Sequence, residues 1–394
     1  MSNATYLKKE NIKQVVLAII NNDLISVPRI AQITGLTGAT VHGITTKLEA
    51  QGSLAKCGLS SSNGGRKAQL YTLNKDYKYL ASISIRTNKI AVGIFDFKMN
   101  LIFKDVSYKD LGDTSVEETI HHIYSFLDKT IKESRVDYNK IASVGINVPG
   151  PVDYLAGNVV ALRGYPKWHN INLAYQMEQL IGIPVYIDKD VSSGLMLIKQ
   201  LYKCQNNSNM IYISIDGGIG AGIMIGGQSY RGNHGVAGEI GHITVQENGE
   251  RCNCGNTGCL ELVSSDYAII KKSKKILHIP DEQYFSIDDA IQKYKDGCSE
   301  IKDVFIEATM YLATTIRNSF MIYDPDNIYI RCKWLEFNKA LFFKLIDELY
   351  DNNTLIDRGD IKISLIQEDD FVLKSAAIIA WNNELRSIDT SFDY

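Results

Sequence analysis

Residues 238–261 read GEIGHITVQENGERCNCGNTGCLE and bring one His and three Cys together in a short stretch rich in glycine. Imidazole and thiolate groups are the ligands that zinc takes in structural sites, and Gly255 and Gly258 let the backbone turn closely around a small ion. Four protein ligands leave no coordination position for water, so the pattern predicts a structural zinc ion. Reduced thiols without a metal are the alternative, but chance rarely places such soft ligands together. The predicted ligands are His242, Cys252, Cys254 and Cys259.

The composition is that of a globular chain with more than one domain. Of its 394 residues, 45% are hydrophobic and 22% are charged, which is near the average for soluble proteins, and the length indicates two or three compact units. No run approaches the ~18 consecutive apolar residues that span a bilayer, and no secretory signal is visible. Seven cysteines, three of them at metal-ligand spacing, indicate a reducing compartment. We therefore expect a cytoplasmic protein without membrane contact.

The charges are divided unevenly between residues 1–75, which we call the head, and the rest of the chain, which we call the body. The head holds nine Lys and Arg against three acidic residues, whereas the body holds 33 against 42, within a net charge of -3. A basic head gains affinity for DNA by releasing counterions from the phosphates. The overall charge alone argues against a nucleic-acid binder, but its distribution favours one.

The head is predicted to begin with two helices. Residues 8–21 carry apolar side chains at helical spacing. The second helix has Ser26 as its candidate N-cap, is expected to bury Ile30 and Ile33, and ends at Gly35.

A third helix is predicted from Thr37 to about Gln51, with Val41, Ile44 and Leu48 pointing inward. Its opposite face is expected to read DNA in the major groove. Two short strands around the basic, turn-rich segment 60–67 then predict a wing that reaches a phosphate or the minor groove. A generic helical subdomain is the alternative interpretation. The candidate DNA-binding residues are Thr37, Ala39, Thr40, His42, Thr46, Lys47, Arg66 and Lys67.

The body alternates strands and helices, which predicts an α/β fold. An antiparallel meander at 80–103 is followed by alternating helical and strand-like segments up to residue 187, and the same order begins again at the strand 210–215. That strand leads into the glycine-rich turn 216–222. The body is therefore expected to contain two similar halves with a ligand cleft between them.

The resulting division of the chain has three parts. We expect a winged helix-turn-helix domain at 1–75, a first α/β lobe at 76–190 and a second α/β lobe with the zinc site at 191–371. The C-terminal helix, 372–394, is expected to return to the first lobe.

Several motifs together resemble the ROK family, which contains sugar kinases and sugar-responsive repressors. They are the GEIGHITV and CNCGNTGCLE segments, the 148–153 segment VPGPVD, the 189–191 segment KDV, the glycine turn at 216–222 and the GGR of the predicted wing. The resemblance runs from about residue 8 to the C-terminus and is nearest to the repressors of the xylose and N-acetylglucosamine types. It implies a two-lobed, actin-like or ribonuclease H-like sugar-kinase fold behind the winged helix-turn-helix.

The resemblance also implies a sugar-binding site whose neighbouring ATP-binding site has been lost. The first phosphate loop of the family kinases corresponds to residues 84–89, where the acid and both glycines are missing, and Asp216 adds a repelling carboxylate to the second loop. Asp190 matches the catalytic base, which is vestigial without bound ATP. Lys189 replaces an Asn of the family pattern. The sugar-binding residues implied by the resemblance are Asn147, Asp190, Glu239, His242 and Glu261.

These observations together predict a cytoplasmic repressor of carbohydrate-utilisation genes rather than an enzyme. A homodimer, or a dimer of dimers, would bind a palindromic operator through the heads, and a small sugar in the cleft would change the affinity for that operator. One alternative is an ATP-dependent sugar kinase with an appended DNA-binding head. Another is a body that mainly binds a transporter or other protein.

Overall fold

The computed structural model describes all residues except 1–2, 62–66, 87, 110, 111, 113, 163, 164, 206, 351–361 and 389–394. It divides into two compact units, one formed by residues 1–203 with 370–394 and the other by residues 204–369. The domain boundaries expected at residues 75, 190 and 371 stay predictions. Among the described helices, none is long and apolar enough to cross a membrane.

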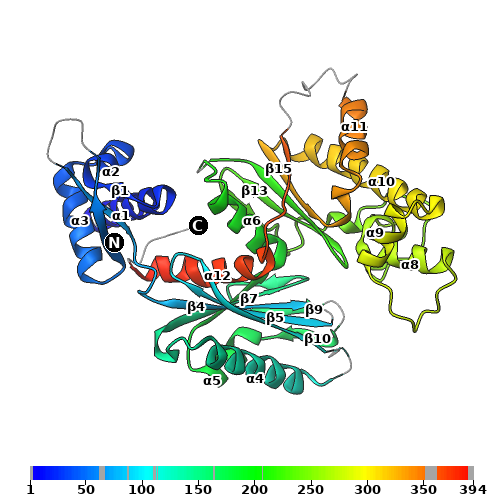
Figure 1. Cartoon of the computed structure of the whole chain (residues 1–394), viewed down its shortest axis with the longest axis horizontal. Helices are drawn as coiled ribbons and strands as arrows, with labels where there is room; N and C mark the ends of the chain where they lie inside the picture. Colours follow the sequence, from blue (N-terminus) through cyan, green and yellow to red (C-terminus); the bar gives the residue numbers. More distant parts are fainter. Residues whose placement is uncertain are drawn as a thin grey trace. The chain divides into compact units, whose positions relative to one another are not determined.

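The head consists of three helices and a small antiparallel sheet, drawn in blue in Figure 1. The helices are α1 (Asn3–Asn22), α2 (Val27–Thr34) and α3 (Gly38–Ala50). The strands β1 (Ile25–Ser26), β2 (Leu54–Leu59) and β3 (Gln69–Leu73) form a sheet in the order β1-β3-β2. The Thr37 hydroxyl accepts a hydrogen bond from the Thr40 amide, which confirms Thr37 as the N-cap of α3.

Three details of the head differ from the sequence prediction. Ile33 is 46% exposed rather than buried, so Ile30 alone carries the buried face of the short helix α2. On α3, Thr45 is fully buried and Ile44 only partly so, because the Thr45 hydroxyl bonds to the Val41 carbonyl and needs no water. Ser26 occupies the N-cap of α2 but its side chain makes no capping hydrogen bond.

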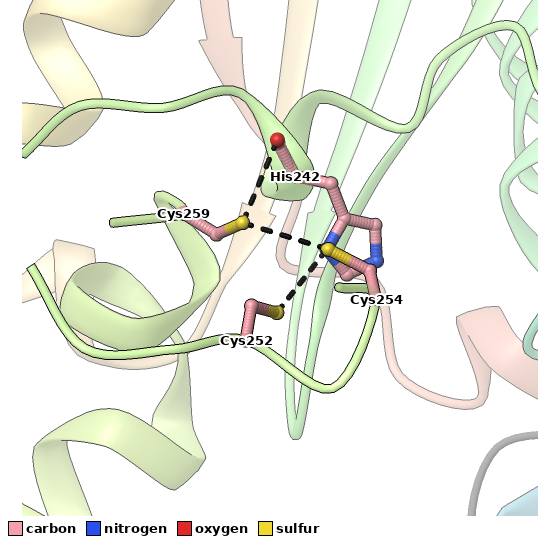
Figure 2. Close-up of side chains that lie close together, drawn as sticks. All are labelled: His242, Cys252, Cys254 and Cys259. Carbon is pink, nitrogen blue, oxygen red and sulfur yellow. Dashed lines mark hydrogen bonds between the residues drawn. The ribbon is translucent and has the colours of Figure 1, made fainter. Parts of the chain in front are cut away.

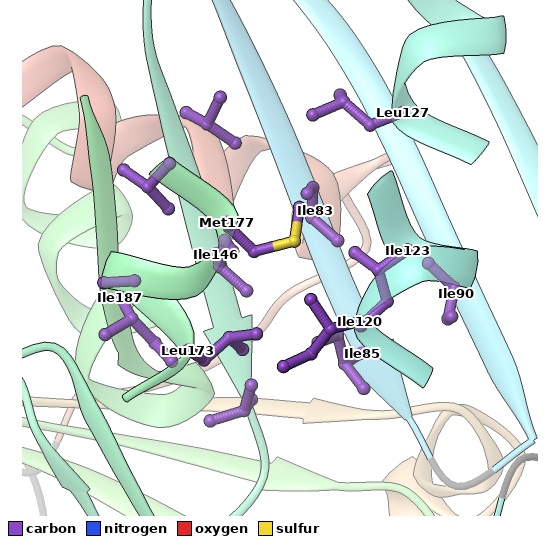
Figure 3. Packing of buried hydrophobic residues seen from close by; sticks show 14 of the residues in the cluster. Ile83, Ile85, Ile90, Ile120, Ile123, Leu127, Ile146, Leu173, Met177 and Ile187 are labelled. Carbon is purple, nitrogen blue, oxygen red and sulfur yellow. The ribbon is translucent and has the colours of Figure 1, made fainter. Parts of the chain in front are cut away.

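The first unit contains a five-stranded mixed sheet in the order β11-β7-β4-β5-β6. Its strands are β4 (Tyr79–Arg86), β5 (Lys89–Asp96), β6 (Leu101–Tyr108), β7 (Ile141–Val148) and β11 (Val185–Lys189). The meander β4–β5–β6 is antiparallel as predicted, and β7 and β11 continue the sheet in parallel. Figure 3 shows α4 (Val116–Ser134) and α5 (Leu173–Ile181) covering one face with apolar side chains such as Ile123, Leu127 and Met177.

The helix α12 (Phe371–Ile388), red in Figure 1, lies across β4 and β7 and also packs against α6 (Asp190–Leu201). Gly145 in β7 allows this packing, because a Cβ there would lie 2.1 Å from the Ala376 carbonyl oxygen. The last helix of the chain therefore belongs to the same unit as the first sheet.

A second small sheet in the first unit is absent from the sequence prediction. It is formed by β8 (Val152–Asp153), β9 (Asn158–Leu162) and β10 (Tyr165–Ile171) in the order β10-β9-β8. The buried Trp168 and Tyr165 of β10 belong to the core of the first unit. Regular alternation is interrupted in this segment by a register shift between Tyr165 and His169, which hides the strand pattern.

The second unit repeats the sheet pattern of the first, in agreement with the prediction that the body contains two similar halves. Its strands are β12 (Met210–Ile215), β13 (Ile219–Ile225), β14 (Gln228–Tyr230), β15 (Asn327–Cys332) and β16 (Ile363–Leu365), in the order β14-β13-β12-β15-β16. Its helices are α7 (Glu261–Ser264), α8 (Asp266–Ile276), α9 (Ile287–Lys295), α10 (Ser299–Tyr323) and α11 (Lys339–Tyr350). The residues of the predicted metal site lie between β14 and α7.

Candidate metal centre and ligand-binding residues

Four side chains of the second unit come together as the sequence predicts. One ligand atom from each of His242, Cys252, Cys254 and Cys259 lies within 4.8 Å of the others, a group that could hold a metal ion. Figure 2 shows that the three thiols and the imidazole face a common centre, with Cys252 Sγ 3.7 Å from His242 Nδ1 and Cys254 Sγ 3.7 Å from Cys259 Sγ. The set of three sulfurs and one nitrogen is the donor set of a closed structural zinc site.

The backbone around this group is shaped by glycine and by one asparagine. Gly258 has φ +66°, and a Cβ there would lie 1.7 Å from the Gln246 carbonyl oxygen, so only glycine fits. Asn256 donates its side-chain amide to the His242 carbonyl at 3.1 Å and to the Thr244 hydroxyl at 3.0 Å. The loop that carries the cysteines is thereby fixed to the segment that carries the histidine.

The buried thiol of Cys259 needs a cation to ionise. Burial, together with the neighbouring thiols Cys254 and Cys252, raises the pKa of this thiol to about 12. A divalent metal deprotonates a coordinating thiol outright. The chemistry of the donors therefore fits a metal ion better than four neutral, unligated side chains.

His242 directs its two ring nitrogens to different neighbours. Nδ1 faces Cys252, while Nε2 lies 3.9 Å from the Glu239 carboxylate. Nε2 is thus turned away from the sulfur group and is available for a polar ligand beside Glu239. The Glu261 carboxylate, which is buried, accepts a hydrogen bond from the Ile219 amide at 3.1 Å. Glu239, His242 and Glu261 therefore all lie next to the metal-binding segment.

The other two predicted sugar-binding residues belong to the first unit. Asn147 is fully buried at the end of β7, and its amide donates to the Val372 carbonyl at 3.1 Å and the Ser375 hydroxyl at 2.9 Å. Asp190 begins α6 and is partly exposed, with Oδ2 3.3 Å from the Arg86 guanidinium. The structure thus presents a carboxylate at this position with an arginine against it.

Arg86 comes from the hairpin that corresponds to the first phosphate loop of the family kinases. Its guanidinium also donates to the Ile85 carbonyl at 3.0 Å, and the Tyr165 hydroxyl donates to the Arg86 carbonyl at 3.1 Å. The bond to Ile85 holds the guanidinium beside Asp190, and the bond from Tyr165 fixes the backbone of Arg86. Sequence reasoning placed Arg86 in this loop but missed the ion pair, because the pair joins residues far apart in the sequence. Thr87 lies outside the described residues.

Asp216 in the glycine turn between β12 and β13 lies near a second carboxyl group, that of Asp266 at the start of α8. Asp216 is exposed, lies 3.9 Å from the Arg331 guanidinium, and its carbonyl accepts a hydrogen bond from the Asp266 amide at 2.9 Å. Asp266 is buried, and its Oδ1 has no hydrogen-bond partner among the described residues. Burial, together with the nearby Asp216 carboxylate, raises the pKa of the Asp266 carboxyl to about 8.

Asp266→Asn is expected to remove a pH dependence of stability. Because the folded-state pKa lies above the unfolded value of about 3.9, the folded chain binds more protons than the unfolded chain between about pH 4 and pH 8, so stability falls as pH rises through this range. The amide carries no such proton. Melting temperatures measured at pH 5 and pH 8 should therefore show the variant gaining stability relative to the parent chain at pH 8. An equal difference at both pH values, or a matching trend in the exposed control Asp303→Asn on α10, would contradict this assignment.

The candidate DNA-binding residues of α3 form an exposed face. Thr37, Ala39, His42, Thr46 and Lys47 are exposed, and Thr40, whose hydroxyl bonds to that of Thr37, is half-buried. Lys67 is also exposed, whereas Arg66 lies outside the described residues.

The body is thus built from two α/β units with the same sheet order, and the second carries the group of one histidine and three cysteines. The family model "ROK family" matches residues 80–353, and the chain belongs to the ROK family. The xylose repressor of Caldicellulosiruptor bescii is 28% identical to it over 388 residues, which cover 96% of each chain. This relative extends over the head as well as the body.

Solved structures share the fold. A ROK family transcriptional regulator, described as a homologue of the Escherichia coli MLC protein, aligns with a TM-score of 0.76 at 22% identity and covers 94% of this chain and 96% of its own. A ROK family glucokinase from Streptomyces griseus, in complex with glucose and AMPPNP, aligns with a TM-score of 0.63 at 21% identity and covers 76% of this chain and 98% of its own. The predicted sugar-kinase-like architecture of the body is therefore confirmed.

Proposed function

We propose that the chain is a cytoplasmic, sugar-responsive transcriptional repressor of carbohydrate-utilisation genes. The observation that carries this proposal is the match along 96% of both chains to a protein named xylose repressor, which includes the basic head. A kinase has no use for a basic head, whereas a repressor needs one.

The head is a winged helix-turn-helix in this proposal. α3 presents Ala39, His42, Thr46 and Lys47 to the major groove, and Thr37 and Thr40 lie at the end of the helix nearest the base edges. The turn between β2 and β3, with Arg66 and Lys67, reaches the phosphates or the minor groove. A palindromic operator is bound by two heads, so the active form is a homodimer or a dimer of dimers.

The body supplies the sugar response. Carboxylates accept hydrogen bonds from paired sugar hydroxyls, and the ring nitrogen Nε2 of His242 offers a further polar contact. We assign recognition of the sugar to Asn147 and Asp190 of the first unit and to Glu239, His242 and Glu261 of the second. Structural zinc on His242 and the three cysteines fixes the orientation of the imidazole.

The test of this proposal is a DNA-binding titration with a panel of sugars. The purified chain first selects duplexes from a random-sequence pool, and its affinity for the selected duplex is then measured with D-xylose, N-acetylglucosamine, other pentoses and hexoses, and their phosphates. One of these sugars is expected to weaken DNA binding by about 5-fold to 150-fold, the usual range of coupling between two sites. The same affinity at every sugar concentration would refute the sugar response.

A sugar kinase with a DNA-binding head is the second candidate, because Asp190 stands where the family kinases have their base. The Arg86 guanidinium is paired with the candidate base Asp190, and the carboxylate of Asp216 in the glycine turn would repel ATP phosphates. We therefore expect no phosphorylated sugar in a coupled assay with ATP and magnesium across the same panel. Turnover that is lost in Asp190→Asn would establish the kinase instead.

Asp190→Asn is also expected to weaken binding of the effector sugar by about 10-fold or more, since a neutral amide accepts hydroxyl hydrogens less strongly than a carboxylate. Isothermal titration calorimetry measures this loss. Asp153→Asn, which changes an exposed carboxylate in β8, serves as the matched control and should bind the sugar like the parent chain. Equal affinities for Asp190→Asn and the parent chain would remove Asp190 from the site.

A further inference from the structure

Phe97 joins the head to the C-terminal helix within the first unit. Its amide donates to the carbonyl of Lys75, the last residue of the head, at 3.0 Å. Its own carbonyl accepts a hydrogen bond from the indole Nε1 of Trp381 in α12 at 2.8 Å. The Phe97 ring is fully buried and stands edge-on to Tyr77, with ring centroids 5.1 Å apart. One residue therefore contacts the head with one backbone group and α12 with the other.

The turn that carries Phe97 is held rigidly. The Asp96 carboxylate accepts hydrogen bonds from the backbone amides of Lys98 at 2.9 Å and Asn100 at 3.0 Å, and from the Asn100 side chain at 2.9 Å. Lys98 in turn forms an ion pair with Asp23, at the corner after α1 of the head, at 2.6 Å. Because these hydrogen bonds make the turn rigid, a movement of α12 at Phe97 would also move the residues of the head that the turn contacts.

The other end of α12 is attached to a residue assigned to the sugar site. Asn147 donates to the Val372 carbonyl and the Ser375 hydroxyl in the first turns of α12, and Gly145 lets β7 approach the Ala376 carbonyl closely. Trp381 lies six positions after Ser375, which is about 9 Å along a helix. A short, stiff element thus links Asn147 at one end to Phe97 and the head at the other.

We propose that α12 transmits the state of the sugar site to the head, with Trp381 as the positioning residue that acts through Phe97. This inference rests on the proposed function, because it explains how a sugar bound to the body changes operator affinity. The sugar must favour one arrangement of β7 and α12 over another. That preference then changes the placement of the head through two hydrogen bonds, from Trp381 to Phe97 and from Phe97 to Lys75.

A fluorine NMR experiment tests the coupling without knowledge of the sugar. The chain contains three tryptophans, Trp168, Trp334 and Trp381. Labelling with 5-fluorotryptophan gives one fluorine resonance for each tryptophan. The variants Trp381→Phe and Trp334→Phe, which each lack one resonance, assign those of Trp381 and Trp334. Saturating the full-length chain with the DNA duplex that it selects from a random pool is expected to shift the Trp381 resonance and to leave that of Trp334 in place. An unmoved Trp381 resonance in the fully DNA-bound chain would overturn the proposal.

Trp381→Phe then separates coupling from binding. The substitution keeps an aromatic ring in α12 but removes the hydrogen bond to Phe97. We expect the DNA affinity of this variant without sugar to stay within about threefold of that of the parent chain, and its sugar affinity to be unchanged. The ratio of its DNA affinities without and with sugar should fall toward one. D-xylose is the first probe, followed by the other sugars of the panel. A full sugar response in this variant would overturn the proposal.

Two further variants keep the result interpretable. Trp334→Phe is the matched control, because Trp334 is equally buried but its Nε1 has no hydrogen-bond partner among the described residues, so it should retain the full response. Ser375→Ala removes one of the two hydrogen bonds from Asn147 to α12 and leaves the bond to the Val372 carbonyl. It is expected to reduce the response in part, and it replaces Trp381→Phe should that variant fail to fold. If no sugar changes the DNA affinity of the parent chain, the proposed function fails. The shift of the Trp381 fluorine resonance on DNA binding still decides whether the head and α12 are coupled.

Discussion

Ala39→Asp is expected to lower the affinity of the chain for its selected DNA duplex by at least about 100-fold. Ala39 is exposed at the second position of α3, where a carboxylate is compatible with the helix and even favoured by the helix dipole. Folding should therefore be unaffected, whereas the new negative charge would face the base edges and phosphates. Fluorescence anisotropy with a labelled duplex measures the loss.

Ala340→Asp provides the matched control for this prediction. Ala340 is likewise exposed at the second position of a helix, α11 of the second unit, so the same substitution changes the net charge equally. Its DNA affinity should equal that of the parent chain. If both variants bind DNA alike, α3 does not lie in the groove.

Cys259→Ser should abolish binding of one zinc ion per chain and destabilise the second unit by on the order of 5 kcal/mol. Cys259 is fully buried, and its loss leaves three ligands and a hydroxyl at the centre of the group. The loop from residue 243 to residue 260 would then lose its metal link to His242 and keep the hydrogen bonds of Asn256. Metal content by mass spectrometry and thermal melting measure the two effects.

Cys298→Ser is the control for the metal site. Cys298 lies outside the group, at the N-cap of α10, where serine is a good capping residue. This variant should keep its zinc and its melting temperature. Purified parent chain that contains no metal, and whose melting temperature is insensitive to zinc and to chelators, would contradict the structural zinc assignment.

The sequence predicts the regular parts of the fold well because their signals are local. The meander β4–β5–β6 and the two sheets of equal order follow from continuous apolar strands, and the cap of α3 follows from Thr37. The group of one histidine and three cysteines is predictable for another reason, since three of its ligands lie in one short loop. The spacing of the three cysteines in this loop then determines most of the geometry of the metal-binding group.

The features that sequence reasoning missed depend on contacts between distant residues. The sheet β8–β9–β10 contains a register shift, and the ion pair of Arg86 with Asp190 joins the end of β4 to the start of α6, which only the folded sheet brings together. The contacts of Asn147 likewise join residues that are far apart in the sequence. The resemblance to the family assigns it to the sugar site, but no local pattern shows that its amide binds α12.

The central claim is that one chain couples a sugar site in the body to DNA binding by the head, and thermodynamic linkage tests it most directly. The sugar affinity should be measured by calorimetry on the free chain and on the chain saturated with its DNA duplex. DNA is expected to weaken sugar binding by the same factor, between about 5-fold and 150-fold, by which the sugar weakens DNA binding. Identical sugar affinities in the two states would contradict it.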